Sequence, residues 1–355
     1  MRVESNKAVC FTLWSSTHNN VRHADLFHML DSVVRIYKLN LSHSRVLRGI
    51  QYRLWHAFSR KLIYPYVLRY LGQRYEKLLT VDYNQIPAWA KPASVIVDMD
   101  DPLFTSGEVA LLNLPQVKAI VVTTERAREL FQQLGVTRPI RVIPQGVAIE
   151  QIYSGKRRNV CTQFKGERDV VVGYQAPTLT LSSDGRRRAR GGQDDLDFLF
   201  AVLEAARREE PRIKLWLIGQ PSKSVKNYVA DGRASWIKLF GYVPFTQILD
   251  YVSNFDIGVY ARMLVQPPAR FNVKLAQFMA CGVPVVSRNL DESFILREAR
   301  SGIVCDSDAE FSQALVKLAR CAEKRAAIGN AGRAYAQTNL DWSILIPAYK
   351  EILKG

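Results

Sequence analysis

The stretch NVKLAQFMACGVPVVS, residues 272–287, decides the fold. Its apolar residues first recur at helical spacing and then, after Gly282, form a continuous run that is typical of a buried strand. Similar runs alternate with helix-like segments along the chain. Strands are predicted at 8–14, 94–101, 117–124, 140–147, 169–175, 214–220, 237–243, 255–261 and 282–288. This alternation predicts an α/β protein with parallel sheets that helices cover on both faces.

The predicted strands fall into two series, separated by a polar and weakly periodic stretch at 148–168. We therefore predict two doubly wound, Rossmann-like domains that face a cleft, the first over 1–155 and the second over 156–338. Ligands of such folds bind at the carboxyl ends of the strands. Residues 178–195, rich in Gly, Ser and Arg, are predicted to form a long loop of the second domain.

The composition limits the classes of function. The 355 residues carry a net charge of +16, which indicates acidic partners such as phosphorylated substrates, an anionic membrane surface or nucleic acid. The five cysteines have no CxxC spacing, so we expect a reduced, cytoplasmic protein without a zinc site. We see no signal peptide at the amino terminus and no run of about 20 apolar residues that could span a membrane. No metal is expected.

The predicted helix in 272–281 offers a phosphate site at its amino end. Free backbone N–H groups and the positive end of the helix dipole favour an anion there. Arg270 and Lys274, one turn apart, could grip one diphosphate together. The alternative is that both side chains belong to a solvated face.

The segment around this helix resembles a known family. VKLAQFMACGVPVVS, residues 273–287, resembles the donor-site segment of retaining glycosyltransferases of the GT-B fold, family 4, the group 1 glycosyltransferases. VIPQGV is similar to the end of that family's first domain, and LWLIG, IKLFGYVP and DIGVYA resemble strands of its second domain. NLDWSILIPAYKEIL resembles a C-terminal segment that crosses back onto the first domain, which implies such a helix at 339–355.

The resemblance implies a transferase that moves a sugar from a nucleotide-sugar donor to a lipid-linked, polysaccharide or small-molecule acceptor, with retention. The nucleotide-sugar is a substrate, and no cofactor is implied. In such enzymes the leaving diphosphate takes the acceptor's proton, and the protein positions the substrates and stabilises negative charge. Arg270 and Lys274 would do so here. Donor contacts are implied for Gly241, Tyr242 and Val243 near the base, and for Arg270, Asn272, Val273, Lys274 and Gln277 near the ribose and diphosphate.

This sequence departs from the family at three places. The family's two glutamates, eight positions apart, are replaced by Ala269 and Gln277. The basic residues that usually follow the second domain's first strand are not cleanly present, and Arg188 is a candidate from the 178–195 loop. These departures bear on donor identity more than on activity. A non-catalytic relative that binds a sugar nucleotide or a partner protein stays open as an alternative.

The first domain holds further candidates. His18, Asn19 and Asn20 follow the first predicted strand and could contact the acceptor or the donor sugar, with His18 as a candidate catalytic residue, or could be ordinary surface residues. Asp98, Asp100 and Asp101, in the sequence DMDD, end another predicted strand, and any of them could orient an acceptor hydroxyl, with Asp100 as a candidate catalytic residue. A DxD pair is also the metal signature of a different glycosyltransferase class, and Asp101-Pro102 could simply begin a helix or a turn.

Residues 35–77 combine ten Lys or Arg with one acid, Glu76, and with eight aromatic residues. A basic amphipathic helix is predicted at 45–60, which suits an anionic membrane surface. The alternative is a helix that covers the first domain's core with its charges in water. A protein that binds single-stranded nucleic acid is the rival from another class, although no nucleic-acid module is visible and none is expected as a partner. Peripheral attachment to a membrane stays open, and the oligomeric state is not predicted.

Overall fold

The computed structural model describes residues 8–14, 34–40, 58–153, 162–181, 196–231, 234–261, 269 and 271–354, together with Leu26 and Leu30. The chain divides into two compact units, each with its own sheet. Unit 1 comprises residues 1–146, 269–271 and 342–355, and unit 2 comprises 147–268 and 272–341. The sequence analysis predicted the corresponding boundaries at 155 and 338, and the chain passes from one unit to the other after residues 146 and 341.

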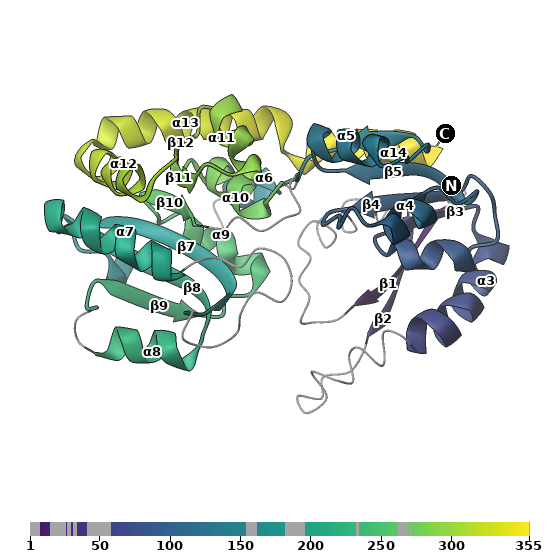
Figure 1. Ribbon diagram of the computed structural model, residues 1–355, viewed down its shortest axis with the longest axis horizontal. Helices are drawn as coiled ribbons and strands as arrows, with labels where there is room; N and C mark the ends of the chain where they lie inside the picture. The colour runs from purple at the N-terminus through teal and green to yellow at the C-terminus, as the bar shows by residue number, and fades with distance from the viewer. Residues whose placement is uncertain are drawn as a thin grey trace. The chain divides into compact units, whose positions relative to one another are not determined.

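Unit 1 contains a six-stranded parallel sheet in the order β2-β1-β3-β4-β5-β6 (Figure 1). Its strands are β1 (Ala8–Trp14), β2 (Val34–Asn40), β3 (Lys77–Thr80), β4 (Val95–Met99), β5 (Val117–Val122) and β6 (Ile140–Val142). Its helices are α3 (Tyr64–Arg74), α4 (Ser106–Leu112), α5 (Glu125–Gln133) and α14 (Trp342–Lys354). The prediction of a parallel α/β unit is confirmed.

The C-terminal helix α14 packs within unit 1, as predicted. Trp342 is fully buried at its start and lies against Gly146, where an added Cβ would come within 2.4 Å of the indole ring. Farther along the helix, Tyr349 Oη donates a hydrogen bond to the buried Asp98 carboxylate (2.8 Å). At the end of α14, Lys77 Nζ donates to the carbonyl of Leu353 (2.6 Å), and a cation at this position complements the helix dipole.

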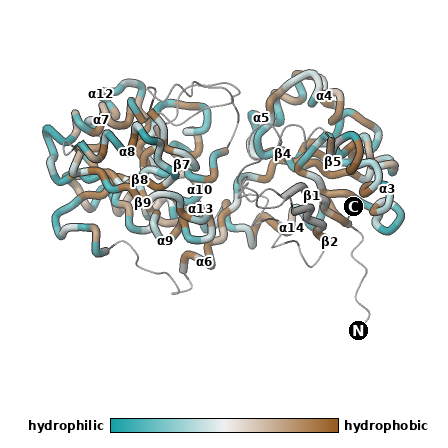
Figure 2. The backbone as a smooth tube through the Cα atoms, turned by 90° about the horizontal axis from the view of Figure 1, so that it is seen from below, coloured by the Kyte–Doolittle hydropathy of each residue, from teal (hydrophilic) through white to brown (hydrophobic). Residues whose placement is uncertain are grey.

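Unit 2 contains a second six-stranded parallel sheet, in the order β12-β11-β10-β7-β8-β9. Its strands are β7 (Val170–Leu179), β8 (Ile213–Pro221), β9 (Ile237–Gly241), β10 (Ile257–Tyr260), β11 (Val285–Arg288) and β12 (Gly302–Cys305). Its helices are α6 (Ile149–Tyr153), α7 (Leu196–Glu209), α8 (Lys223–Ala230), α9 (Ile248–Val252), α10 (Val273–Cys281), α11 (Phe294–Glu298), α12 (Asp308–Arg320) and α13 (Ala322–Asn339). In Figure 2 the brown, hydrophobic colour concentrates in strands such as β7 and β8.

Helix α10 is buried along its whole body, from Leu275 to Cys281. It ends at Gly282, which takes the left-handed conformation (φ +70°) that ends many helices. Helix α13 covers it at close range, because Gly329 lies so near the Gly282 carbonyl oxygen that an added Cβ would come within 2.0 Å. The amino end of α10 is its less buried part, since Asn272, Val273 and Lys274 are only half-buried.

Several predicted elements need correction. The strand predicted at 140–147 ends at Val142, because Pro144 and Gly146 do not continue the ladder. Strands β2, β3 and β12 were not predicted. Most of the helix predicted at 45–60 lies outside the described residues.

Candidate functional site

The amino end of α10 begins as the sequence predicts. Asn272 caps the helix, and its side-chain oxygen accepts a hydrogen bond from Lys274 N (3.0 Å). The first turn contains no acidic side chain. The helix dipole and the Lys274 ammonium therefore act together, and both favour a negatively charged ligand at this end.

Lys274 lies beside the central strand of the unit 2 sheet. Its Nζ is 5.6 Å from the centroid of the Tyr174 ring on β7. Strands β8 and β9 extend the sheet from β7 in one direction, whereas β10, β11 and β12 extend it in the other. Ligands of doubly wound sheets bind where the strand order reverses in this way. Lys274 is thus placed at the switch point between β7 and β10.

Gln277 connects α10 to β7 through a buried pair of amides. Its Oε1 accepts a hydrogen bond from Gln175 Nε2 (2.9 Å), and the two residues are 2% and 5% exposed. Among the described residues, Gln277 Nε2 and the buried Tyr174 Oη have no hydrogen-bond partner. Buried polar atoms without partners are uncommon, and they often mark ligand contacts.

The predicted base-binding residues lie at the carboxyl end of β9, two strands from β7 in the same sheet. Gly241 has φ +74°, and an added Cβ there would meet nothing within 4 Å. Tyr242 is 53% exposed, whereas Val243 is buried. The turn thus presents an aromatic ring on the surface, at the same end of the sheet as Lys274.

A buried carboxylate that we did not predict lies beside β10 and β11. Glu292, in the turn after β11, accepts a hydrogen bond from Tyr260 Oη at the end of β10. Next to it, the hydroxyls of Ser287 and Ser293 are 2.8 Å apart. In the sequence, the only sign of this site was that Glu292 follows closely after a buried apolar run. Positions 269 and 277 hold no acid, but Glu292 places a carboxylate near the carboxyl ends of β10 and β11.

In unit 1, the predicted acceptor residues have different surroundings. Asp98 is fully buried on β4 and holds Tyr349, so the structure gives it a role in fixing α14. Asp100 is half-buried in the turn that follows. No group of three or more His, Cys, Asp or Glu that could hold a metal ion occurs in the described part of the chain. Contact of either aspartate with an acceptor stays a prediction.

Ala269 belongs to unit 1 by its packing, although it lies between β10 and α10 in the sequence. It is buried, and its φ of +77° is unusual for a residue other than glycine. Its carbonyl accepts a hydrogen bond from Thr124 Oγ1 (2.8 Å), at the residue that also caps α5. Backbone strain of this kind often occurs at functional sites. Thr124 gave no signal in the sequence, since 145 positions separate it from Ala269.

The remaining predicted site residues lie outside the described residues. They are His18, Asn19, Asn20, Arg188 and Arg270. Their predicted contacts with acceptor and donor stay predictions.

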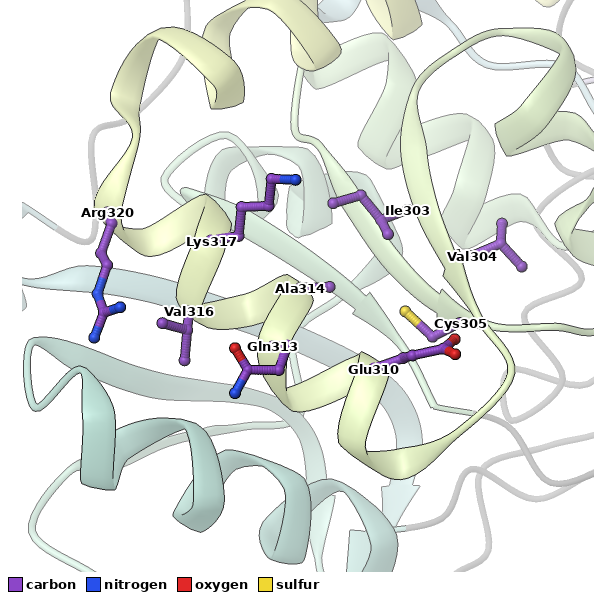
Figure 3. A pocket seen from close by; sticks show the side chains of 9 residues that line it. All are labelled: Ile303, Val304, Cys305, Glu310, Gln313, Ala314, Val316, Lys317 and Arg320. Atoms are coloured by element: carbon purple, nitrogen blue, oxygen red, sulfur yellow. The ribbon is translucent and has the colours of Figure 1, made fainter.

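A cavity of about 530 Å³ lies along β12 and α12, away from the switch point (Figure 3). Its lining includes Cys305, Glu310, Lys317 and Arg320. Burial, with the nearby Glu310 and Asp306 carboxylates, raises the pKa of the Cys305 thiol to about 11. The thiol is therefore protonated at neutral pH and is a poor nucleophile. We do not assign the active site to this cavity.

Comparison with known proteins gives a family match for part of the chain and a fold match for nearly all of it. Residues 185–321 match the family model described as glycosyl transferases group 1. A GDP-mannose-dependent monoacylated alpha-(1-6)-phosphatidylinositol monomannoside mannosyltransferase of Corynebacterium glutamicum is 24% identical over 197 residues, which are 52% of this chain and 49% of that protein. The chain thus matches only about half the length of this curated relative.

Solved structures share the fold of nearly the whole chain. Anabaena HepE in complex with UDP and glucose has a TM-score of 0.65 and 14% identity, over 98% of this chain and 99% of that one. WaaG, a glycosyltransferase involved in lipopolysaccharide biosynthesis, has a TM-score of 0.64 and 16% identity, over 98% of this chain and 99% of that one. The chain therefore has the GT-B fold, and its residues 185–321 are similar to the group 1 glycosyltransferase domain.

Proposed function

We propose that this protein is a glycosyltransferase that uses a nucleotide-sugar donor, bound by unit 2. The observation that carries the proposal is Lys274 at the capped amino end of α10, at the switch point of a group 1 glycosyltransferase domain. The HepE structures that contain UDP or UDP-glucose support a nucleotide-sugar as the donor class. The sugar, the base and the acceptor are not specified by this argument.

In the proposed reaction, the bond between the sugar carbon and the donor diphosphate breaks, and a bond from that carbon to an acceptor oxygen forms. The acceptor hydroxyl gives its proton to an oxygen of the leaving diphosphate. The Lys274 ammonium and the positive end of the α10 dipole stabilise the negative charge that develops on the diphosphate. The step needs no side chain that attacks the sugar, so the replacement of the family's glutamates by Ala269 and Gln277 does not prevent it. We propose retention at the sugar carbon and no cofactor beyond the donor.

The acceptor class and the place of action belong to the proposal as well. We propose a lipid-linked, polysaccharide or small-molecule acceptor and a cytoplasmic protein. The C. glutamicum relative, whose name gives it a phosphatidylinositol mannoside as its substrate, supports the lipid-linked choice. Among the described residues, no helix has the length and apolar character needed to cross a bilayer.

A panel of UDP-, GDP-, ADP- and dTDP-sugars, followed by thermal unfolding, tests the donor class. A ligand at 100 times its dissociation constant adds about 2.7 kcal/mol to the free energy of unfolding. We expect one nucleotide to raise the melting temperature, and Lys274→Ala to reduce that rise. No rise with any donor in the panel would contradict the proposal.

A transfer assay then separates an enzyme from a non-catalytic relative, because both would show the thermal shift. Release of the nucleoside diphosphate that depends on an added acceptor is the expected result. Binding without turnover, across lipid-linked and soluble acceptors, would favour the non-catalytic alternative.

Gln277→Ala is expected to weaken donor binding about tenfold, or about 1.4 kcal/mol. The amide is covered, so a donor hydroxyl reaches it only after neighbouring side chains move, but its Nε2 and the second lone pair of its Oε1 are then available. Neutral hydrogen bonds contribute about 0.5–1.5 kcal/mol each. Gln277→Glu should bind the donor equally or more tightly, since a carboxylate can still accept from Gln175.

Calorimetric titration of the donor measures this effect, with Gln313→Ala on the exposed side of α12 as the matched control. A lower melting temperature with unchanged donor affinity in Gln277→Ala would show that the amide pair only joins α10 to β7.

A further inference from the structure

Helix α3 has apolar residues on two opposite sides. Tyr64, Leu68 and Leu71 are buried in the core of unit 1. At 3.6 residues per turn, Tyr66 and Tyr70 lie roughly opposite this buried side, and they are 75% and 49% exposed. A helix on the surface of a globular protein ordinarily presents polar residues on its outer side. The outer side of α3 therefore needs an explanation other than folding.

The exposed apolar side continues before the helix at intervals of four residues. Leu62 is 49% exposed and Phe58 is 47% exposed. The other large hydrophobic residues that are exposed in the described part of the chain are spread along it: Leu103, Leu134, Phe164, Tyr242, Phe294 and Ile344. A concentration of exposed apolar side chains marks an interaction surface.

Cations flank these side chains. Lys61, Arg69 and Arg74 are exposed, and the Arg74 guanidinium lies 4.5 Å from the centroid of the Tyr70 ring. Residues 58–75 contain no Asp or Glu. We define the α3 patch as Phe58, Lys61, Leu62, Tyr66, Arg69, Tyr70 and Arg74 (α3 is labelled in Figure 1).

We propose that the α3 patch docks unit 1 on a membrane surface that contains anionic lipids. Tyrosine rings are enriched at the headgroup level of membranes, where one end of the ring is apolar and the other is hydrated. Leu62 and Phe58 would enter the acyl boundary, while the cations contact anionic headgroups. A second copy of the chain fits the patch less well, because a two-fold interface would place the same cations against one another. The inference goes beyond the proposed transfer reaction and does not require it.

Sedimentation with vesicles tests the charge component. At low ionic strength, the wild type should bind vesicles of phosphatidylcholine and phosphatidylglycerol, and should bind pure phosphatidylcholine weakly. Each cation near such a surface contributes about 1 kcal/mol, or about fivefold in affinity. Arg69→Gln combined with Arg74→Gln should therefore weaken binding about 30-fold. The matched control is Arg126→Gln on α5, an exposed arginine of the same unit, which should leave binding unchanged.

The tyrosines test the apolar component. Tyr66→Ser combined with Tyr70→Ser should lower binding at least about tenfold, even at high salt, where charge contributions are screened. Leu134→Ser, an exposed apolar residue at the end of α5, should not change it. Melting curves without lipid check that each variant is folded.

Four outcomes would overturn the inference. The first three are equal binding to neutral and anionic vesicles, unchanged binding of the tyrosine variant, and self-association without lipid that the tyrosine variant abolishes. Retention of single-stranded DNA in place of vesicles, lost in the arginine variant, would also overturn it. None of these measurements needs a sugar donor. A result against membrane docking would therefore not count against the proposed glycosyltransferase activity.

Discussion

Lys274→Ala is expected to lower turnover by about 10²–10³, the usual effect of removing one group that stabilises developing negative charge. The ammonium lies at the amino end of α10, where the proposed reaction leaves a diphosphate. Its contact with the Tyr174 ring contributes about 0.5–2 kcal/mol, depending on how far the ammonium is desolvated. Lys274→Ala should therefore lower turnover by far more than it lowers thermal stability.

Initial rates at saturating donor and acceptor measure this effect. Lys226→Ala, which removes an exposed lysine of α8 in the same unit, is the matched control and should keep wild-type turnover. Lys274→Arg should recover part of the activity, since it restores the charge with a different geometry. Wild-type turnover in Lys274→Ala would show that this lysine belongs only to a solvated face.

Trp342→Ala is expected to destabilise unit 1 by about 3–5 kcal/mol, the usual cost of truncating a fully buried tryptophan. The indole packs on Gly146, at the point where α14 begins, and the cavity left behind cannot be filled by the glycine. For a unit of this size, each kcal/mol corresponds to about 2–4 °C. A fall of roughly 6–20 °C in the melting temperature of unit 1 should follow.

Differential scanning calorimetry suits this prediction, because two units with separate cores can unfold in separate transitions. The transition assigned to unit 1 should move and that of unit 2 should not. Ile344→Ala, two residues along α14 and 47% exposed, controls for changes to the helix itself. A shift in Trp342→Ala no larger than in Ile344→Ala would mean that α14 contributes little to the unit.

The sequence predicted the strands that are continuous apolar runs. VVVGY in β7 and LWLIG in β8 are buried on both faces, and this burial leaves a pattern that can be read without a structure. Strand β2, VRIYKLN, carries two basic residues, and β3 and β12 have only four residues each. Length alone is not the cause, because β10 and β11 also have four residues and were predicted. Charged residues and partial burial weaken the pattern of the missed strands, and their pairing with neighbours identifies them.

In the candidate site, features set by neighbouring residues could be predicted, whereas contacts between residues far apart in the sequence could not. The cap at Asn272 and the position of Lys274 follow from one stretch of sequence, because a helix start depends on neighbouring residues. The Gln175–Gln277 pair and the Thr124–Ala269 hydrogen bond join residues 102 and 145 positions apart. Such contacts depend on strand order and packing, so no local pattern could have predicted them.

The enclosed body of α10 has a consequence for how donor choice can change during evolution or in the laboratory. Seven consecutive residues, Leu275 to Cys281, are buried, and Gly329 of α13 leaves no room for even a methyl group beside Gly282. Substitutions there alter the volume of a closely packed interior and are costly. A mutant library aimed at a new sugar nucleotide should therefore hold 275–282 constant. Its diversity belongs at Val273, which is half-buried, and at Tyr242, which is exposed, while Asn272 and Lys274 keep the helix cap and the charge.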